Sequence, residues 1–216
     1  MNTVQPIREI SQIHKIEDIL KKSNYRNYIL FKLGIYSGYR ISDIIKLRVS
    51  DIRGKIYFET TENKTGKKRK VIIHPTFKSE LDLFIKGKGD NEYLFPSKKY
   101  KNIIKKKTKV RNPVTNKMNT IYIDIENDAP NSPISRVQAY RILKDASKQI
   151  ELNDTATHTL RKTFAYHLYM NSADKNGNKD IVMVQKILGH STPEQTLRYI
   201  GIMQSDEDSL VCSLAY

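Results

Sequence analysis

Apolar residues recur every third or fourth position through most of this chain, which is the spacing of helices with one buried face. The spacing changes to two between residues 55 and 75, where two strand-like segments, 55–61 and 69–75, flank a turn-rich stretch. With 216 residues the chain is long enough for a real core. We therefore expect one domain, residues 1–216, that is mainly α with a small antiparallel β-sheet (a basic hairpin), an α+β fold. The expected helices are 15–38, 40–49, 76–89, 135–152, 158–172 and 180–190, and the second should bury one face made of Ile41, Ile44, Ile45 and Leu47. The helix at 135–152 opens with a capping box of Ser135 and Gln138.

The charge balance is strongly basic, because 38 lysines and arginines stand against 23 aspartates and glutamates, a net charge of +15. Such a chain attracts polyanions, and its binding should weaken steeply with salt. Nucleic acid is therefore the leading partner class, ahead of an anionic membrane surface or a ribosomal-type scaffold. The sequence has no apolar run long enough to span a membrane and no signal-peptide pattern. We expect a cytoplasmic, nucleoid-associated protein without a membrane partner.

Cysteine and carboxylate usage argue against two other kinds of site. The single cysteine, Cys212, excludes an intramolecular disulfide framework and a thiolate metal cluster. The sequence also shows no carboxylate constellation of the kind that a two-metal nuclease needs. We therefore expect no metal and no cofactor, and we expect Cys212 to be half-buried in a C-terminal helix.

Residues 98–132 break the helical pattern. They are rich in lysine and contain no acid before Asp124. A solvated, partly disordered loop is the favoured interpretation for the interior of this segment. The functional alternative is a phosphate-contacting arm in which residues 119–125 add a strand. The residues alone leave both interpretations open.

The stretch LGHSTPEQTLRYIG, residues 188–201, carries helix signals that agree with each other. Gly189 is the residue type that commonly follows a helix end. Thr192 can cap the next helix, the proline after it suits the first helical position, and Gln195 completes a capping box. Tyr199 then lies about two turns into that helix.

Five polar positions suit chemistry, although each alone has an ordinary structural explanation. Arg40 follows YSGY at a helix start, where backbone N–H groups favour an anion, yet such an arginine is commonly a surface residue. Lys64 at the hairpin tip would by itself be a solvated turn lysine. His158 and Arg161 are three apart, so they share one helical face, and the threonine before them is a plausible N-cap. His190 alone would be a loop histidine that caps a carbonyl.

The order of these residues resembles that of the tyrosine recombinase (phage integrase) family. The shared order is an arginine, a hairpin lysine, His-x-x-Arg, Gly-His and a tyrosine nine residues further on. The segments YSGYRISDIIKLRVSDI, THTLRKTFAYHLY and VQKILGHSTPEQTLRYIG are similar to the three boxes of that family. The resemblance covers roughly residues 10–203, is interrupted by 98–132, and implies the catalytic-domain fold of the family. The chain is similar to its short solo members, such as fimbrial-switch recombinases.

The chemistry of these groups suits a phosphodiester. Attack on the phosphorus builds negative charge on the non-bridging oxygens, which Arg40 and Arg161 can clamp in bidentate fashion. His190 can add another donor. A phenol is mostly protonated at neutral pH, so Tyr199 needs help to become a nucleophile, and His158 is a candidate base.

The resemblance implies further roles and partners. Lys64 would protonate the leaving 5′-oxygen, which yields a covalent 3′-phosphotyrosine, and a second 5′-hydroxyl then rejoins the strands. The partner would be double-stranded DNA at a specific site, with Holliday-junction strand exchange in a homotetramer and an accessory directionality factor. Off DNA the chain would be a monomer or a weak oligomer. The residues that we expect to bind DNA are Lys67, Lys68, Arg69, Lys105, Lys106 and Lys107.

The chain also departs from its family. Most members carry an N-terminal core-binding domain that clamps the far side of the DNA, and the catalytic pattern here begins too early to leave room for one. Such a chain should bind DNA more weakly, and the basic arm near residues 101–109 is the candidate that compensates for this loss. The tail, residues 202–216, either docks on a neighbouring subunit or folds back on its own domain.

Two rival functions remain at this stage. A type IB topoisomerase resembles this fold and uses nearly the same residues, and a DNA-binding regulator would have lost catalysis. The Gly-x-Arg-Ile-Ser and Leu-Gly-His boxes favour a recombinase over a topoisomerase, and the six filled positions argue against a regulator. The expected origin is a bacterium, an archaeon, a phage or another mobile element.

Overall fold

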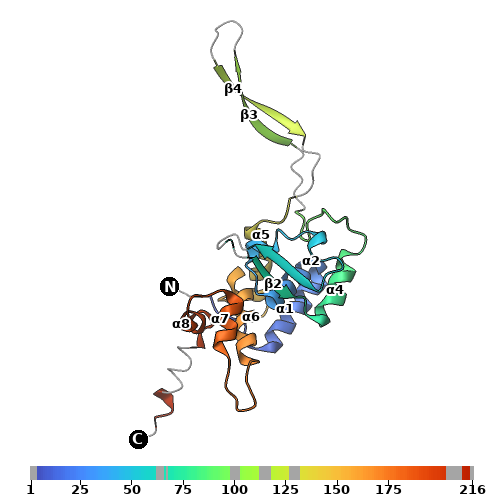
Figure 1. The fold of residues 1–216 in the computed structure, drawn as a ribbon. Coiled ribbons are helices and arrows are strands. Elements are labelled where there is room, and N and C mark those ends of the chain that lie inside the picture. The colour runs from blue at the N-terminus through green and yellow to red at the C-terminus, as the bar shows by residue number, and fades with distance from the viewer. Residues whose placement is uncertain are drawn as a thin grey trace.

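The computed structural model describes residues 4–61, 66, 68–97, 103–111, 118–126, 132–202 and 211–214. Helices form one body, and a two-stranded ribbon projects far out from it (Figure 1). The predicted class, mainly α with a small antiparallel sheet, is confirmed. The helix at the centre of the body, α6 (Thr157–Met170), contacts α2 (Tyr25–Ser37), α5 (Arg136–Lys148), α7 (Ile181–Leu188) and α8 (Pro193–Ile200).

The first predicted helix, 15–38, is in fact two helices, α1 (Ile10–Ser23) and α2. The break lies at Asn24, whose backbone is extended with φ −166° and ψ 112°. The Asn24 side chain accepts a hydrogen bond from the N–H of Arg26 at 3.0 Å and so caps α2. The prediction of one continuous helix was wrong because a capping asparagine outweighed the continuous apolar spacing.

The second predicted helix, 40–49, is shortened to the single turn α3 (Ile41–Ile44). Beyond it the backbone pairs with a distant segment, since Leu94 N–H donates to the Leu47 carbonyl at 2.8 Å and Val49 N–H donates to the Glu92 carbonyl at 3.0 Å. These bonds replace the helical ones, and a short 3₁₀ turn, η1 (Val49–Asp51), follows. The predicted apolar face is nevertheless buried: Ile41, Ile44, Ile45 and Leu47.

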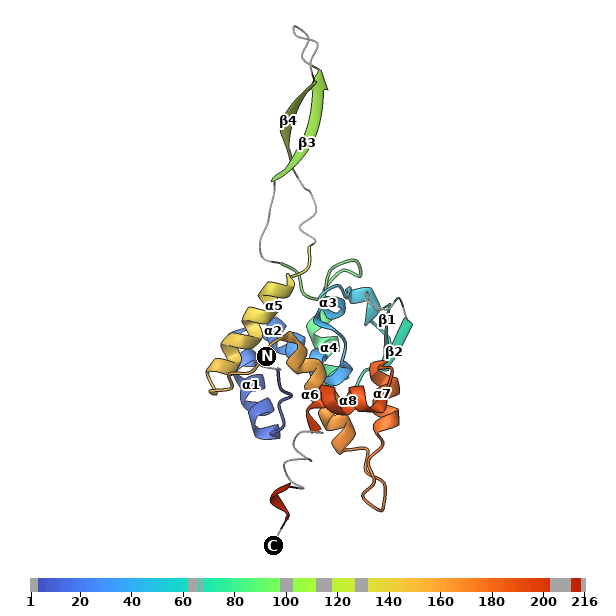
Figure 2. The ribbon, with the colours of Figure 1, turned by 90° about the vertical axis from the view of Figure 1, so that its left-hand side faces the viewer.

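The predicted hairpin is present. Strands β1 (Tyr57–Thr61) and β2 (Lys68–Ile72) are antiparallel, with Tyr57 opposite Ile72. Helix α4 (Pro75–Ile85) follows β2 and starts at a proline, whose fixed φ suits the first helical position. The hairpin and α4 lie beside the helices that carry the candidate site (Figure 2).

Helix starts follow the predicted caps with one exception. Ser135 Oγ accepts from the N–H of Gln138 at 3.1 Å at the start of α5, and Thr192 Oγ1 accepts from the N–H of Gln195 at 3.2 Å at the start of α8. Thr157, however, is the first residue of α6 and not its N-cap. Ala156 is the N-cap, and the chain there is held by Thr159, which accepts from the Ala156 N–H at 3.0 Å.

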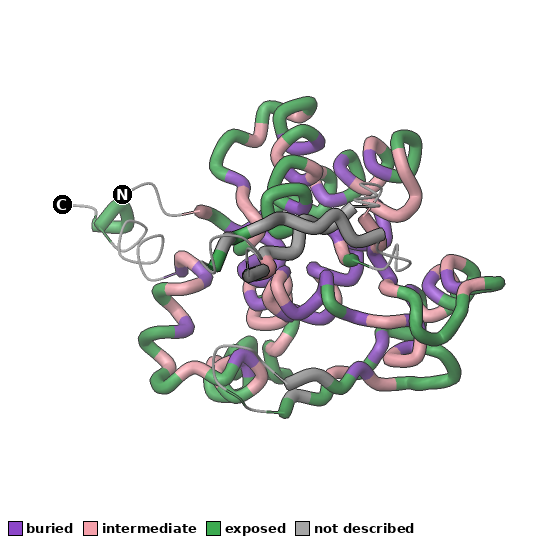
Figure 3. Tube along the Cα trace, turned by 90° about the horizontal axis from the view of Figure 1, so that it is seen from above, coloured by how far each residue is buried: buried purple, intermediate pink, exposed green. Residues whose placement is uncertain are grey.

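Two apolar clusters make up the core. The larger one gathers buried residues from the N-terminal helices, α4 and α5 and ends at Leu160 in the first half of α6. The smaller one, Ala165, Val184, Leu188, Ile200 and Ile202, joins the second half of α6 to α7 and α8. Buried positions run through the middle of the body, with exposed ones on its rim (Figure 3). Helix α6 therefore belongs to both clusters.

The projecting ribbon consists of β3 (Ile103–Arg111) and β4 (Met118–Glu126), paired antiparallel with Lys105 opposite Asp124 and Lys109 opposite Thr120. For these residues the loop interpretation of 98–132 was wrong, and the strand expected at 119–125 is present, whereas the phosphate-contacting role of the arm stays a prediction. The apolar-polar alternation of β4 accounts for the strand, although the first part of the segment is rich in lysine.

The C-terminal residues 211–214 are exposed and lie away from the body (Figure 1). Cys212 is exposed, so the expectation of a half-buried cysteine was wrong. These four residues do not pack against the helical body. Within the described part of the chain, no helix combines the length and apolar character needed to cross a membrane.

Candidate active site

Arg161 lies in the second turn of α6 with only 2% of its surface exposed. Its Nη1 donates to the carbonyl of Gly38 and its Nη2 to the carbonyl of Leu188, each at 2.7 Å. These carbonyls stand at the C-terminal ends of α2 and α7, where backbone oxygens lack a helical partner and positive charge is favourable. Arg161 therefore ties two helix ends together while it holds a cation inside the protein.

Arg40 is half-buried and precedes α3 as its N-cap. Two residues before it, Gly38 ends α2 with a left-handed φ of 60°. A Cβ at Gly38 would lie 2.2 Å from Cδ1 of Phe164, so this turn needs glycine both for its backbone and for its space. The turn at Gly38 thus sets the position of Arg40, which follows two residues later. The carbonyl of Gly38 also fixes the side chain of Arg161 by accepting its hydrogen bond.

His158 lies one turn before Arg161 on the same face of α6. Partial burial lowers the pKa of His158 below its ordinary value of 6.5, and the positive charges of Arg161 and Arg40 lower it further. The imidazole is therefore neutral at pH 7 and can accept a proton.

A cleft of about 600 Å³ opens at Arg40 and His158. Its wall continues to the exposed cations Lys46 and Arg136. A cleft lined by Arg40, Lys46 and Arg136 suits the phosphates of a nucleic acid. Across the residues that the structure describes, no group of three or more His, Cys, Asp or Glu side chains could hold a metal ion.

His190 follows Gly189, which ends α7 with a left-handed φ of 69°, as its residue type predicted. The Nδ1 of His190 lies 3.1 Å from Oγ1 of Thr196, a buried residue of α8. The ring of His190 meets the ring of Tyr199 edge to face, with centroids 5.0 Å apart. The loop after α7 is therefore fastened to α8 next to the tyrosine.

Tyr199 lies in the second turn of α8, and its hydroxyl oxygen is shielded from solvent. Burial raises the pKa of Tyr199, and the nearby positive charges of Arg161 and Arg40 offset only part of that rise. The phenol is therefore protonated at neutral pH. The structure brings five of the six candidate side chains into one site: Arg40, His158, Arg161, His190 and Tyr199.

Two side chains at this site escaped the sequence analysis. Lys162 follows Arg161, and its Nζ lies 5.1 Å from the centroid of the Tyr199 ring. Asp43, three residues after Arg40, is 3% exposed. A lysine in a basic chain gives no signal by type, and neither does a single acid in a helical segment. The one signal available was the spacing of four between His158 and Lys162, which puts both on one helical face.

The remaining candidates cannot be placed in the same way. Lys64 and Lys67 lie outside the described residues. Lys68 is exposed at the start of β2. Four others have a described backbone in β2 or β3 but no described side chain: Arg69, Lys105, Lys106 and Lys107.

Comparison with known sequences identifies the family of the chain. The sequence pattern of the family described as "Phage integrase family" matches residues 7–205, and the chain belongs to that family. The probable integrase/recombinase YoeC of Bacillus subtilis is 40% identical over 209 residues, which cover 97% of this chain and 94% of YoeC. The tyrosine recombinase XerD of Staphylococcus haemolyticus is 25% identical over 203 residues, or 94% of this chain and 59% of XerD. The chain thus spans about three-fifths of the length of that XerD.

Solved structures share the fold. The crystal structure of XerA recombinase matches with a TM-score of 0.62 at 20% identity, over 99% of this chain and 67% of that one. The catalytic domain of bacteriophage HP1 integrase matches with a TM-score of 0.52 at 23% identity, over 97% of this chain and 95% of that one. Family and relatives together make the chain a tyrosine-type site-specific DNA recombinase, and neither rival function is favoured.

Proposed function

We propose that Tyr199 is the nucleophile with which this chain cuts DNA, and that a covalent 3′-phosphotyrosine links the two. The observation that carries the proposal is the gathering of two arginines and two histidines around a tyrosine with a buried hydroxyl. Fixed cations aimed at developing negative charge are usually the largest contribution to such catalysis. Double-stranded DNA is the substrate, in keeping with the net charge of +15 and the basic cleft.

The reaction runs in two balanced transesterifications. Arg40 and Arg161 hold the non-bridging oxygens of the scissile phosphate, and His158 takes the proton of the Tyr199 hydroxyl. The phenolate oxygen then bonds to phosphorus while the bond from phosphorus to the 5′-oxygen breaks. A 5′-hydroxyl of another strand later attacks the phosphotyrosine, which releases Tyr199 and rejoins the DNA.

Lys64 is the proposed donor of the proton that the leaving 5′-oxygen requires. An ammonium group is protonated at neutral pH and can supply it from the hairpin between β1 and β2. His190 adds a hydrogen-bond donor to the phosphate, for which its place beside Tyr199 is suited.

Contacts with the rest of the DNA are assigned to the basic positions of the hairpin and the ribbon β3–β4. The major groove of B-DNA is wide enough to admit a two-stranded ribbon. On this proposal the ribbon adds contacts with the DNA beyond those made at the cleft. The residues concerned are Lys67, Lys68, Arg69, Lys105, Lys106 and Lys107.

Strand exchange at a Holliday junction would use a tetramer of this chain on DNA, with a directionality factor as accessory. A structural neighbour is lambda integrase, whose tetramer has been solved bound to a Holliday junction. The exposed residues 211–214 suit the docking of the tail on a neighbouring subunit. Deletion of residues 209–216 should then weaken assembly on DNA but leave single-strand cleavage intact, and equal assembly by both proteins would exclude docking.

A covalent-trapping experiment tests the nucleophile. Nicked DNA fragments that include sequence flanking the coding gene are incubated with the wild-type chain or with Tyr199→Phe and then denatured. We expect a protein–DNA band that resists denaturation with the wild type alone, because the variant lacks the attacking oxygen. Sequencing of the trapped ends identifies the site.

Two outcomes would contradict the proposal. A band of equal strength with Tyr199→Phe would mean that another residue attacks. Trapped ends spread evenly over unrelated sequences, together with relaxation of any supercoiled plasmid, would indicate a topoisomerase.

A further inference from the structure

Lys162 is a buried cation at the site that the reaction scheme leaves unused. It is 9% exposed and lies on the face of α6 that carries His158 one turn earlier. Its charge reaches the site, because it is one of the cations that lower the pKa of His158. Among the described residues, no carboxylate forms an ion pair with Lys162.

The group that faces Lys162 is the ring of the nucleophile. Its Nζ lies 5.1 Å from the centroid of the Tyr199 ring, within the distance at which a cation is attracted to an aromatic face. His190 meets the same ring edge to face from the loop between α7 and α8. The ring of Tyr199 thus has Lys162 of α6 over its face and His190 of the α7–α8 loop against it.

A purely structural role does not explain a lysine at this position. Burying an ammonium group is costly unless something compensates its charge, and burial here lowers the pKa of Lys162. Beyond Lys162 on α6 and beyond Tyr199 on α8 the next buried residues, Ala165 and Ile200, belong to the smaller apolar cluster. A methionine or leucine would fill the same volume without that cost.

We propose that Lys162 is a positioning residue for the nucleophile, and that its ammonium group holds the ring of Tyr199 in the site for attack on the phosphate. The proposal deepens the function proposed above and rests on Tyr199 as the nucleophile. Without this cation, the ring keeps its contact with His190 and the hydroxyl keeps the charge of Arg161 nearby, but the face of the ring loses its attraction to Lys162. The tyrosine then spends less time in the attacking position.

The test measures single-turnover formation of the covalent complex at saturating enzyme. Lys162→Met keeps the length of the side chain and removes the charge, and Lys162→Arg keeps the charge. We expect the methionine variant to form the complex roughly 5- to 30-fold more slowly, which is the range of a partly desolvated cation–ring contact. The arginine variant should recover most of the rate. Lys186→Met, an exposed lysine of α7, is the control for the loss of one positive charge.

A second measurement separates positioning from DNA binding and from proton donation. Affinity is measured in the Tyr199→Phe background, where Lys162→Met should bind no worse than Lys186→Met. Cleavage is also measured on DNA whose scissile 5′-oxygen is replaced by sulfur, because a thiolate leaves without a proton. A defect in positioning persists on this substrate, whereas a defect in an acid is relieved.

The outcomes can be told apart. No covalent complex with the wild type would overturn the proposed function itself. A wild-type complex with equal rates for Lys162→Met and Lys186→Met would overturn only the role of Lys162. Loss of affinity that matches the loss of rate would make Lys162 a phosphate contact, and rescue by the sulfur substrate would make it an acid. If Lys162→Met does not fold, the test rests on Lys162→Arg, which keeps the charge. A folded Lys162→Arg that does not cleave DNA would then reject the proposal that the charge positions Tyr199.

Discussion

Gly38 shows how one residue can set the geometry of a site without contacting its substrate. Its left-handed backbone turns the chain from α2 toward Arg40, and its carbonyl accepts a hydrogen bond from Arg161. Both proposed phosphate clamps therefore depend on this turn. A side chain here would meet Phe164, which belongs to the same helix as Arg161.

Substitution of Gly38 by alanine should lower both stability and cleavage. A left-handed backbone costs a residue with a side chain roughly 1–2 kcal/mol, and overpacking adds roughly 1–3 kcal/mol. We expect a loss of about 3 kcal/mol in the free energy of unfolding, measured by urea denaturation, and slower covalent trapping because Arg161 shifts.

Gly54 provides a matched control for this prediction. Its φ of 69° is also left-handed, but nothing lies within 4 Å of the Cβ that alanine would add. Gly54→Ala should therefore lose only about 1 kcal/mol and keep its cleavage rate. Equal losses for the two variants would show that Phe164 does not restrict Gly38.

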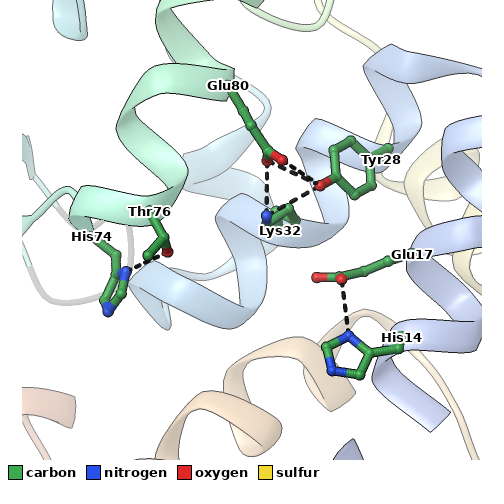
Figure 4. A network of polar contacts seen from close by, with 7 residues as sticks. All are labelled: His14, Glu17, Tyr28, Lys32, His74, Thr76 and Glu80. Atoms are coloured by element: carbon green, nitrogen blue, oxygen red, sulfur yellow. Dashed lines mark hydrogen bonds and ion pairs between the residues drawn. The ribbon is translucent and has the colours of Figure 1, made fainter. Parts of the chain in front are cut away.

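At the scale of elements, helices α2 and α4 are joined by a partly buried ion pair between Lys32 and Glu80 (Figure 4). Lys32 Nζ donates to Glu80 Oε2 at 2.8 Å, and the Tyr28 hydroxyl donates to the same carboxylate at 2.9 Å. Burial alone would raise the pKa of Glu80, but the hydrogen bonds from Lys32 and Tyr28 lower it below its ordinary value. Burial raises the pKa of Tyr28 to about 12, so that phenol remains a donor.

Substitution of Glu80 by glutamine should destabilise the fold by about 2 kcal/mol at neutral pH, because it leaves the buried Lys32 without its counter-charge. A carboxyl with a lowered pKa in the folded state stabilises the protein above the pKa of the unfolded chain. That contribution is lost as pH falls through the folded pKa. The difference between wild type and Glu80→Gln in urea denaturation should therefore shrink below about pH 4.5.

An exposed pair on the same helix controls for charge alone. Lys78 and Asp82 form an ion pair one turn apart on α4, with the Asp82 side chain 47% exposed. Asp82→Asn should lose less than about 0.5 kcal/mol. If Glu80→Gln loses as little free energy of unfolding as Asp82→Asn, the partial burial of the Lys32–Glu80 pair does not increase its contribution to stability.

The ribbon β3–β4 is the second element whose role can be tested. The ribbon projects from the body, and an isolated two-stranded ribbon is only marginally stable in water. We therefore expect the ribbon to serve binding and not the stability of the fold. Triple replacement of Lys105, Lys106 and Lys107 by alanine should reduce DNA affinity at low salt by tenfold or more, since each phosphate contact releases a counterion. Unchanged affinity in a fluorescence-anisotropy titration would remove the ribbon from the DNA interface.

At the scale of the whole molecule, the site lies where the two apolar clusters meet on α6. The first half of that helix packs in the larger cluster through Leu160, and the second half packs in the smaller one through Ala165. Arg161 lies between these positions and bonds to both sides. The site is therefore assembled by the packing of both clusters against α6.

The same packing predicts that each chain cleaves DNA with its own tyrosine. Tyr199 lies against His190 and Lys162 of its own chain. A mixture of Arg40→Ala and Tyr199→Phe proteins should therefore form no covalent complex on DNA, although each variant supplies what the other lacks. Thermal denaturation confirms that both variants fold. Recovery of cleavage in the mixture would mean that tyrosines are exchanged between subunits.

Several features followed from the sequence because their causes lie within a few residues. The caps at Ser135 and Thr192, the glycine at the end of α7 and the β1–β2 hairpin all depend on neighbouring side chains and backbone. The order of an arginine, a His-x-x-Arg pair, a Gly-His pair and a tyrosine likewise identified the family before any geometry was known.

Other features were decided only when distant segments packed together. Arg161 bonds to carbonyls 123 and 27 residues away, and no local pattern reveals such partners. The helix predicted at 40–49 was cut short by hydrogen bonds to residues 92–94. Lys162 is indistinguishable by type from the other lysines of a basic chain, and only the docking of α8 on α6 puts its charge against the ring of Tyr199. The sequence gives the type of each residue, but its burial and its distance from other residues exist only in the packed chain. Because burial and nearby charges determine protonation and contacts, the tertiary structure decided the chemistry of these residues.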